Sequence, residues 1–164
     1  MIAELTRQES LGVLARTQLG RLACSKGMQP YVVPFYFAYQ DKCLYSFSMP
    51  GQKIDWMRAN PLVCVEADQM RREHWTSVVV FGRYKELPDT EEMESERALA
   101  VALLQKRPEW WEPGREKIAP CCPAPVAARA MALVFYRIDI AKISGRRSGP
   151  ESGASGVPRK PTAY

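Results

Sequence analysis

The sequence contains a single histidine, His74, among its 164 residues. A Ser-His-Asp site needs a histidine base beside its nucleophile, and a histidine-rich metal centre needs several imidazole ligands. One histidine cannot supply the second kind of site, and we find no Ser-His-Asp set that would form the first. We therefore predict no catalytic side chain and no metal site.

Long apolar runs are also missing. No run approaches the length of a membrane span, and the first residues lack a basic stretch followed by an apolar one. We therefore expect neither membrane insertion nor secretion, and we predict a cytoplasmic location.

The cysteines do not form a disulfide pattern, because their number, five, is odd. Cys24, Cys43 and Cys64 each lie in an apolar, strand-like run, where a reduced cysteine behaves as a small hydrophobic residue. Cys121 and Cys122 are adjacent, and adjacent cysteines rarely meet disulfide geometry without strain. We expect free thiols, and the role of the adjacent pair stays open between a loop, a metal and a redox function.

The positive charge is concentrated at the C-terminal end. Residues 144–164 hold four basic side chains against one acidic one, so only +2 of the formal net charge of +5 belongs to the rest of the chain. The rest shows no stripe of basic and aromatic residues, so we do not expect nucleic-acid binding. Residues 144–164 are also rich in Ser, Gly and Pro and cannot offset their ordering entropy. We predict one domain over residues 1–143 and a disordered basic tail over residues 144–164.

The apolar patterns favour a mainly β protein with helices. Thr6 and Glu9 form a capping box before a first helix, an apolar pattern after Lys53 predicts a second, and an acidic first turn from Asp89 predicts a third. Sheet strands outnumber helices, and closure into a barrel would remove free sheet edges. The predicted strands are Leu19 to Ser25, Tyr31 to Tyr39, Cys43 to Ser48, Leu62 to Ala67, His74 to Leu87 and Met131 to Ile143.

The stretch from Pro30 to Pro61 contains the clearest candidate site. It is predicted to form two strands, a loop with Gly51 and Lys53, and a helix. Backbone N–H groups at a helix N-terminus carry partial positive charge, and a lysine adds a full one, so a phosphate group is the natural ligand. The alternative is a plain loop with a solvated lysine.

Several motifs in this order resemble the FMN-binding split-barrel family of pyridoxamine-phosphate oxidase and its relatives, which include nitroimidazole-resistance flavoproteins. The resemblance covers residues 5 to 142. The motifs are Val33-Pro34-Phe35, Leu44-Tyr45-Ser46, Gly51-x-Lys53 followed by Asn60-Pro61, and the run from His74 to Gly82-Arg83.

The resemblance implies a six-stranded antiparallel split β-barrel of Greek-key type with flanking helices, in the α+β class. It also implies a homodimer with FMN at the subunit interface. The phosphate would lie at the Gly51 loop with a hydroxyl from Ser46 or Ser48, and these serines alternate with Tyr45, which would contribute through its backbone. The implied cofactor-binding residues are Val33, Pro34, Phe35, Tyr45, Ser46, Ser48, Gly51, Gln52, Lys53, Trp75 and Ser77.

Each of these residues also has a structural interpretation. Val33, Pro34 and Phe35 match the main chain beside the flavin ring, which is compatible with a core strand. Ser77 matches a glutamine near the flavin in pyridoxamine-phosphate oxidases. Trp75 lies on the same strand face and would cover the ring, fill a dimer seam or belong to the core.

Departures from the family pattern bear on the reaction. The chain has Gly51-Gln52-Lys53 where the vitamin B6 enzyme has Ser-Arg-Lys, and it lacks that enzyme's arginine before the first flavin strand. The Arg-x-His pattern is also missing. We therefore do not expect vitamin B6 oxidation, and the general flavoprotein or nitroimidazole-resistance branch fits better.

Three functions follow as hypotheses. The first is an FMN-dependent oxidoreductase in which the cofactor carries the electrons, acting on a small molecule that the sequence does not identify. The second is a non-catalytic flavin, haem or F420 binding protein or sensor, with His74 as the axial ligand in the haem case. The third is an interaction protein that uses the basic tail.

Overall fold

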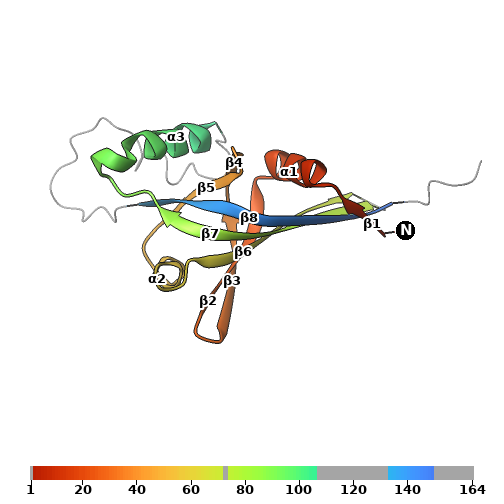
Figure 1. The fold of residues 1–164 in the computed structure, drawn as a ribbon, viewed down its shortest axis with the longest axis horizontal. Coiled ribbons are helices and arrows are strands. Elements are labelled where there is room, and N and C mark those ends of the chain that lie inside the picture. Colours follow the sequence, from red (N-terminus) through yellow and green to blue (C-terminus); the bar gives the residue numbers. More distant parts are fainter. Residues whose placement is uncertain (1, 72–73, 107–132, 150–164) are drawn as a thin grey trace, which may run out of the picture.

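The computed structural model of the chain describes residues 2–71, 74–106 and 133–149 (Figure 1). Its elements, in chain order, are β1 (Ile2–Leu5), α1 (Arg7–Arg16), β2 (Leu19–Lys26), β3 (Gln29–Tyr36), β4 (Ala38–Gln40), β5 (Cys43–Ser48), α2 (Gln52–Ala59), β6 (Leu62–Arg71), β7 (His74–Glu86), the 3-10 turn η1 (Glu91–Met93), α3 (Glu94–Gln105) and β8 (Val134–Ser148).

One antiparallel sheet forms the body of the molecule. Its strand order is β3-β2-β6-β7-β8-β5-β4, and β1 pairs with β8 outside this path. In Figure 1, α1 and α3 lie above the β7 and β8 ribbons and α2 lies below them. The predicted α+β class and split-barrel architecture are confirmed. None of the described helices is long and apolar enough to cross a membrane.

Two apolar clusters hold these elements together. The larger joins α1 and α2 to the inward-facing side chains of the sheet, including Leu22, Val65 and Tyr136. The smaller joins α3 to β5 and the first residues of β8, through Tyr45 and Phe135 among others. The sheet therefore has one face that points to the main core and an opposite face that α3 covers only near one end.

The N-terminus of α1 is closed by hydrogen bonds between Thr6 and Glu9. The Thr6 hydroxyl accepts a hydrogen bond from the Glu9 N–H at 3.2 Å, and the Glu9 carboxylate accepts one from the Thr6 N–H at 2.8 Å. The predicted capping box is therefore present. It satisfies two helix N–H groups and lowers the pKa of Glu9, mainly through the Thr6 backbone.

The described residues form eight strands, where the sequence predicted six. The predicted strand from Tyr31 to Tyr39 is divided at Phe37, whose N–H donates to the Gln18 carbonyl at 2.9 Å. Residues before this point pair with β2 and residues after it pair with β5, so one apolar run serves two partners. The other additional strand is β1, which is too short to give a periodic pattern.

The long strands extend beyond their predicted ends. The segment from Asp68 to Arg71 lies outside the predicted strand, which ends at Ala67, but continues β6. The predicted tail boundary at residue 143 is wrong, because β8 runs to Ser148 between β7 and β1. Its Ser, Gly and Arg residues give no apolar signal, yet both neighbouring strands supply hydrogen-bond partners. The described residues do not include residues 150–164 of the predicted tail, nor do they include Trp110, Trp111, Cys121 and Cys122.

Gly82 lies at an irregularity between β7 and β8, where no side chain fits. A Cβ atom there would lie 2.5 Å from Ile138 Cγ2 and 2.8 Å from the Asp139 carbonyl oxygen. We expect Gly82→Ala to lower the free energy of unfolding by about 1 to 3 kcal/mol, as overpacking does. Urea unfolding measures this, with Gly51→Ala as the control because a Cβ at Gly51 meets open space. Equal stability of the two variants would contradict the prediction.

Candidate functional site

The loop between β5 and α2 presents unpaired helix N–H groups. Gly51 is the N-cap of α2, and no side chain caps this end. The Gly51 carbonyl accepts from the Asp55 N–H at 3.0 Å, which closes the first turn, but the N–H groups of Gln52 and Lys53 have no partner within the helix. This end differs from that of α1, which its capping box closes. It is suited to bind an anion supplied from outside the chain.

Lys53 adds a full positive charge at this helix end. Its side chain is partly buried, and burial lowers the pKa of its ammonium from 10.5, while the nearby Cys24 thiol acts in the opposite direction. No carboxylate within the described part of the chain lies at ion-pair distance from it. A partly desolvated cation without a counterion is unfavourable by itself and gains from a bound anion.

The body of α2 is fixed against the β2 and β3 hairpin. Trp56 packs on Tyr31 with ring centroids 5.5 Å apart. After the helix, Asn60 donates to the Ser25 hydroxyl at 3.1 Å, and its side-chain oxygen accepts from the Leu62 N–H at 3.2 Å. The predicted Asn60-Pro61 motif thus ends the helix and begins β6, which holds the loop at the other end of α2 in place.

The two predicted serines have different environments. Ser46 is 1% exposed and donates to the Tyr36 carbonyl at 2.7 Å, so its hydroxyl belongs to the joint between β3, β4 and β5. Ser48 lies on the same strand face, closer to the loop, and is half-buried. Tyr45 points to the opposite face and is buried in the α3 cluster, where burial raises the pKa of its phenol. Of these three side chains, Ser48 is the one placed to reach a ligand at the loop.

Val33, Pro34 and Phe35 lie on β3, an edge strand of the sheet. Phe35 is 3% exposed and stacks on Phe37, so its side chain belongs to the core. Val33 pairs with Leu22 and is half-buried, whereas Pro34 is exposed. Because β3 is an edge strand among the described residues, the main chain of this segment lies at the edge of the sheet, whereas the Phe35 ring is buried.

Trp75 and Ser77 line a hollow of about 490 Å³. Both are partly buried, and the Ser77 hydroxyl donates to Glu66 at 2.8 Å. Arg146 also lines this hollow; sequence reasoning missed it because it placed this residue in the disordered tail. The pairing of Arg146 with Ser77 across β7 and β8 could not be found from local patterns.

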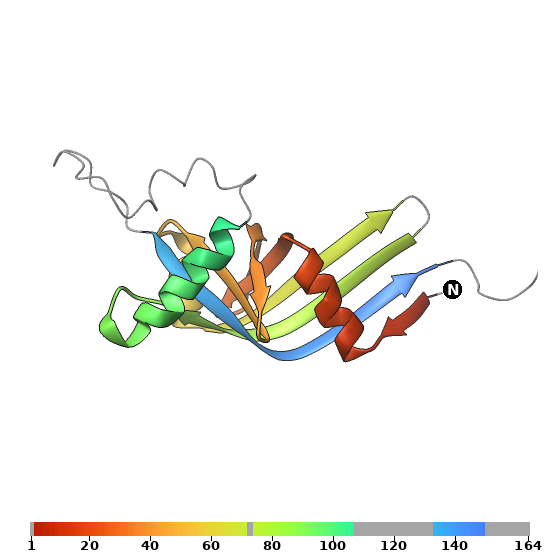
Figure 2. The same ribbon diagram turned by 90° about the horizontal axis from the view of Figure 1, so that it is seen from above.

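The chain does not bring the loop and the hollow together. Lys53 lies next to Cys24 on the inner face of the sheet, and the adjacent sheet row runs from Ala23 through Cys64 to Phe81. Counted from Phe81, Ser77 lies four residues and Trp75 six residues along β7, which is about 13 and 20 Å. Both lie on the outer face of the sheet, opposite to the inner face that carries Cys24. Figure 2 shows from above how far the long strands β6, β7 and β8 extend. Within one chain, the predicted site is therefore in two parts.

Comparison with known proteins agrees with this architecture. A family model described as pyridoxamine 5'-phosphate oxidase matches residues 6–147. An uncharacterized protein of Rhizobium meliloti (strain 1021) is 46% identical over 143 residues, which cover 87% of this chain and 92% of that protein. The chain belongs to the pyridoxamine 5'-phosphate oxidase-like split-barrel family. The resemblance predicted from the sequence motifs is confirmed.

Two solved structures extend this comparison. The crystal structure of a FAD-binding protein from Mesorhizobium loti is 45% identical, has a TM-score of 0.75, and covers 91% of this chain and 99% of that chain. The FAD binding protein from Mycobacterium smegmatis is 23% identical with a TM-score of 0.60, and covers 88% of this chain and 95% of that chain. The second likeness shows the fold alone.

The thiols in the described part of the chain all have raised pKa values. Burial is the main cause that raises the pKa of the thiols of Cys24, Cys43 and Cys64. All three are free. His74 is exposed at the start of β7, and within the described residues no group of three or more His, Cys, Asp or Glu side chains is placed to hold a metal ion. Raised thiol pKa values leave little of the nucleophilic thiolate at neutral pH.

Cys43 allows this chemistry to be tested. Burial and its hydrogen bond to Asp139, at 3.3 Å, raise the pKa of its thiol to about 11. We expect iodoacetamide labelling of Cys43 to rise about tenfold per pH unit between pH 8 and 10, since only the thiolate reacts. Asp139→Asn should increase the rate at pH 8. Peptide mass spectrometry measures both rates, and a labelling plateau below pH 9 would contradict the assigned pKa.

Proposed function

We propose that the protein binds a flavin through its phosphate at the Gly51 to Lys53 loop, and acts as a flavin-dependent oxidoreductase. The observation that carries the proposal is Lys53, a partly desolvated cation without a carboxylate partner among the described residues, at an uncapped helix end. A phosphate supplies the missing negative charge and accepts hydrogen bonds from the free N–H groups.

The residues present fit such a group. A Cβ at Gly51 would meet open space, so the loop backbone is accessible to a ligand. Ser48 supplies a hydroxyl on the strand that leads into the loop, and the free edge of β3 at Val33 and Pro34 offers main-chain groups to the ring. When bound, the flavin supplies the electron transfer, and the protein residues bind and orient it.

FMN is the flavin that we propose. FMN ends in a single phosphate group, which suits a loop whose single lysine is Lys53. The FAD-binding protein of Mesorhizobium loti, which is 45% identical, supports a flavin in general and makes FAD the first alternative. Flavin binding without turnover, and binding of F420 or haem, are the other outcomes that the binding experiment separates.

We propose further that the protein is a homodimer in which a second copy covers the outer face of β2, β3, β6 and β7. Val32, Leu62 and Phe81 are 59%, 62% and 52% exposed there, and Val32 and Phe81 lie on one cross-strand row. The same face carries Arg21 with Glu66 and Asp68, so it offers charges of both signs to a second copy. A partner would also bring its own Trp75 and Ser77 to a bound flavin.

Binding titrations test the proposed function. The purified chain is titrated with FMN, FAD, riboflavin and F420, and the quenching of flavin fluorescence or the change in absorbance is measured; haem is titrated separately. We expect FMN to bind at least ten times more tightly than riboflavin, which lacks the phosphate. Equal affinity for both would contradict the phosphate site. Reduction of bound FMN by NADH or NADPH and its reoxidation by nitro or quinone acceptors tests turnover, which a non-catalytic binding protein would not show.

A further inference from the structure

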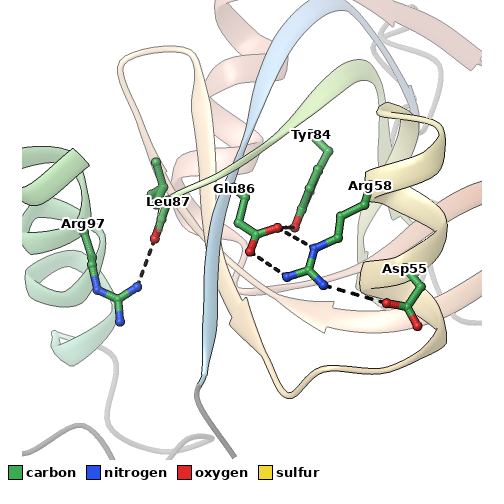
Figure 3. A network of polar contacts seen from close by, with 6 residues as sticks. All are labelled: Asp55, Arg58, Tyr84, Glu86, Leu87 and Arg97. Atoms are coloured by element: carbon green, nitrogen blue, oxygen red, sulfur yellow. Dashed lines mark hydrogen bonds and ion pairs between the residues drawn. The ribbon is translucent and has the colours of Figure 1, made fainter. Parts of the chain in front are cut away.

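The last turn of α2 is joined to β7 by a polar network. The Arg58 guanidinium donates two hydrogen bonds to the Glu86 carboxylate, Nε to Oε2 at 2.8 Å and Nη2 to Oε1 at 2.7 Å. The Tyr84 hydroxyl donates to the same Oε2 at 3.0 Å. Asp55, one turn earlier on α2, lies 3.8 Å from Arg58. Figure 3 shows these four side chains meeting between the helix and the end of the strand.

The charges in this network stabilise one another. The hydrogen bonds from Arg58 lower the pKa of Glu86, and those to Glu86 raise the pKa of the guanidinium. Burial is the first cause that raises the pKa of the Tyr84 phenol, and the Glu86 charge is the second. Glu86 is therefore ionised and Tyr84 protonated at neutral pH, which is the state in which each donor has its acceptor.

The network restricts the orientation of α2 more tightly than its apolar contacts do. Ile54 and Met57 bury α2 in the main core, but apolar packing tolerates small rotations of a helix. A planar guanidinium that donates two parallel bonds to one carboxylate permits only a narrow range of angles. Among the described ion pairs, Arg58 with Glu86 is the one that joins α2 to a strand.

The network and the phosphate loop are the two ends of one short rigid element. Lys53 lies in the first turn of α2 and Arg58 in the last, which is about 7.5 Å along a helix that rises ~1.5 Å per residue. A rotation of α2 about its contacts moves the loop N–H groups and the Lys53 ammonium together. Hydrogen bonds to a phosphate weaken with displacements well below 1 Å.

We infer that Arg58, Glu86 and Tyr84 are positioning residues that align α2 for phosphate binding, so that they control selectivity for phosphorylated over dephosphorylated flavin. The inference rests on the proposed function, because it concerns the ligand of the same loop. A network that only stabilises the fold would change the affinity for FMN and riboflavin equally. A positioning network changes the ratio between them.

The experiment measures dissociation constants for FMN and riboflavin, with thermal unfolding, on Glu86→Gln. We expect FMN affinity to fall about tenfold and riboflavin affinity to stay unchanged. The factor is taken from metal sites, where loss of a residue that orients a ligand weakens binding at least about tenfold. Arg97→Gln is the matched control: Arg97 donates to the carbonyl of Leu87, the residue after Glu86, at 2.9 Å but holds α3 (Figure 3). This control should lower stability and leave the FMN to riboflavin ratio unchanged.

A second variant keeps the test decisive if Glu86→Gln does not fold. Tyr84→Phe removes one hydroxyl from Glu86 and should reduce the same ratio by a smaller factor. An unchanged ratio in the folded variants, with wild-type protein that prefers FMN, would overturn the positioning role alone. Wild-type protein that binds neither flavin, or binds both equally, would instead overturn the proposed function on which the inference rests.

Discussion

Replacing Lys53 with methionine is expected to weaken FMN binding by about 1.5 to 3 kcal/mol, which corresponds to roughly 10- to 150-fold in the dissociation constant. The reason is that the ammonium supplies the full positive charge at the end of α2. Riboflavin affinity should change little, because it has no phosphate. Fluorescence titration with the two flavins measures the difference. Unchanged FMN affinity would place the phosphate elsewhere.

The same substitution should leave the ligand-free protein as stable as the wild type or more stable. Burial lowers the pKa of Lys53 in the folded state, so the charged ammonium opposes folding at pH 7, where it is protonated in both states. This destabilisation is fully present below the lowered pKa and is lost as the pH rises towards 10.5, the ordinary value. Methionine keeps the length of the side chain and removes the charge.

Urea unfolding of both proteins without ligand at pH 7 measures this effect. Lys26→Met is the control, since Lys26 is exposed at the end of β2. A Lys53→Met protein that is much less stable than both would show that the ammonium has a favourable partner. The combination of weaker binding with undiminished stability is what distinguishes a binding residue from a structural one.

Introducing a charge at Phe81 is expected to give a monomer. Phe81 is 52% exposed on the outer face of the sheet, in the row that includes Val32 and Cys64. In the proposed dimer Phe81→Glu places a carboxylate in an apolar contact and removes a central interface aromatic, which costs about 2 kcal/mol or more, roughly 30-fold in the dimer dissociation constant. Light scattering after size-exclusion chromatography measures the mass of the particle.

Flavin binding should fall together with the dimer. Within one chain, Trp75 and Ser77 lie on the outer face of the sheet and Lys53 lies next to the inner face. In the proposed dimer a bound flavin therefore contacts Lys53 of one chain and Trp75 and Ser77 of the other. Met28→Glu is the control: Met28 is 100% exposed in the turn between β2 and β3, away from the strand rows of this face. It should leave mass and affinity unchanged. A monomeric wild-type protein, or a dimer that Phe81→Glu leaves intact, would contradict this arrangement.

The local elements of the fold were predictable because their causes lie within a few residues. The capping box of Thr6 and Glu9 satisfies its donors within one turn, and the loop from Gly51 to Lys53 lies directly between an apolar strand and a helical pattern. The Asn60 motif ends α2 by contacts next to it in the chain. For these features the sequence predicted both the element and its position.

Pairing between distant segments was less predictable. The strand from Tyr31 to Tyr39 is divided because its two halves have different partners, and β8 continues through Ser144 to Ser148 because β7 and β1 lie on both sides. Ser46 was expected at a phosphate, but its hydroxyl is used by the Tyr36 carbonyl. A strand pattern shows which side chains share a face and not which neighbours will occupy that face.

The sequence by itself determined the α+β class, the split-barrel family and the position of the loop before α2, since these depend on periodicity, turn residues and motif order. Only the tertiary structure decided that Lys53 is partly desolvated without a carboxylate partner among the described residues, that Arg58 joins α2 to Glu86 on β7, and that Trp75 and Ser77 lie far from the loop. Desolvation and alignment arise when segments distant in sequence pack together, so no local pattern contains them.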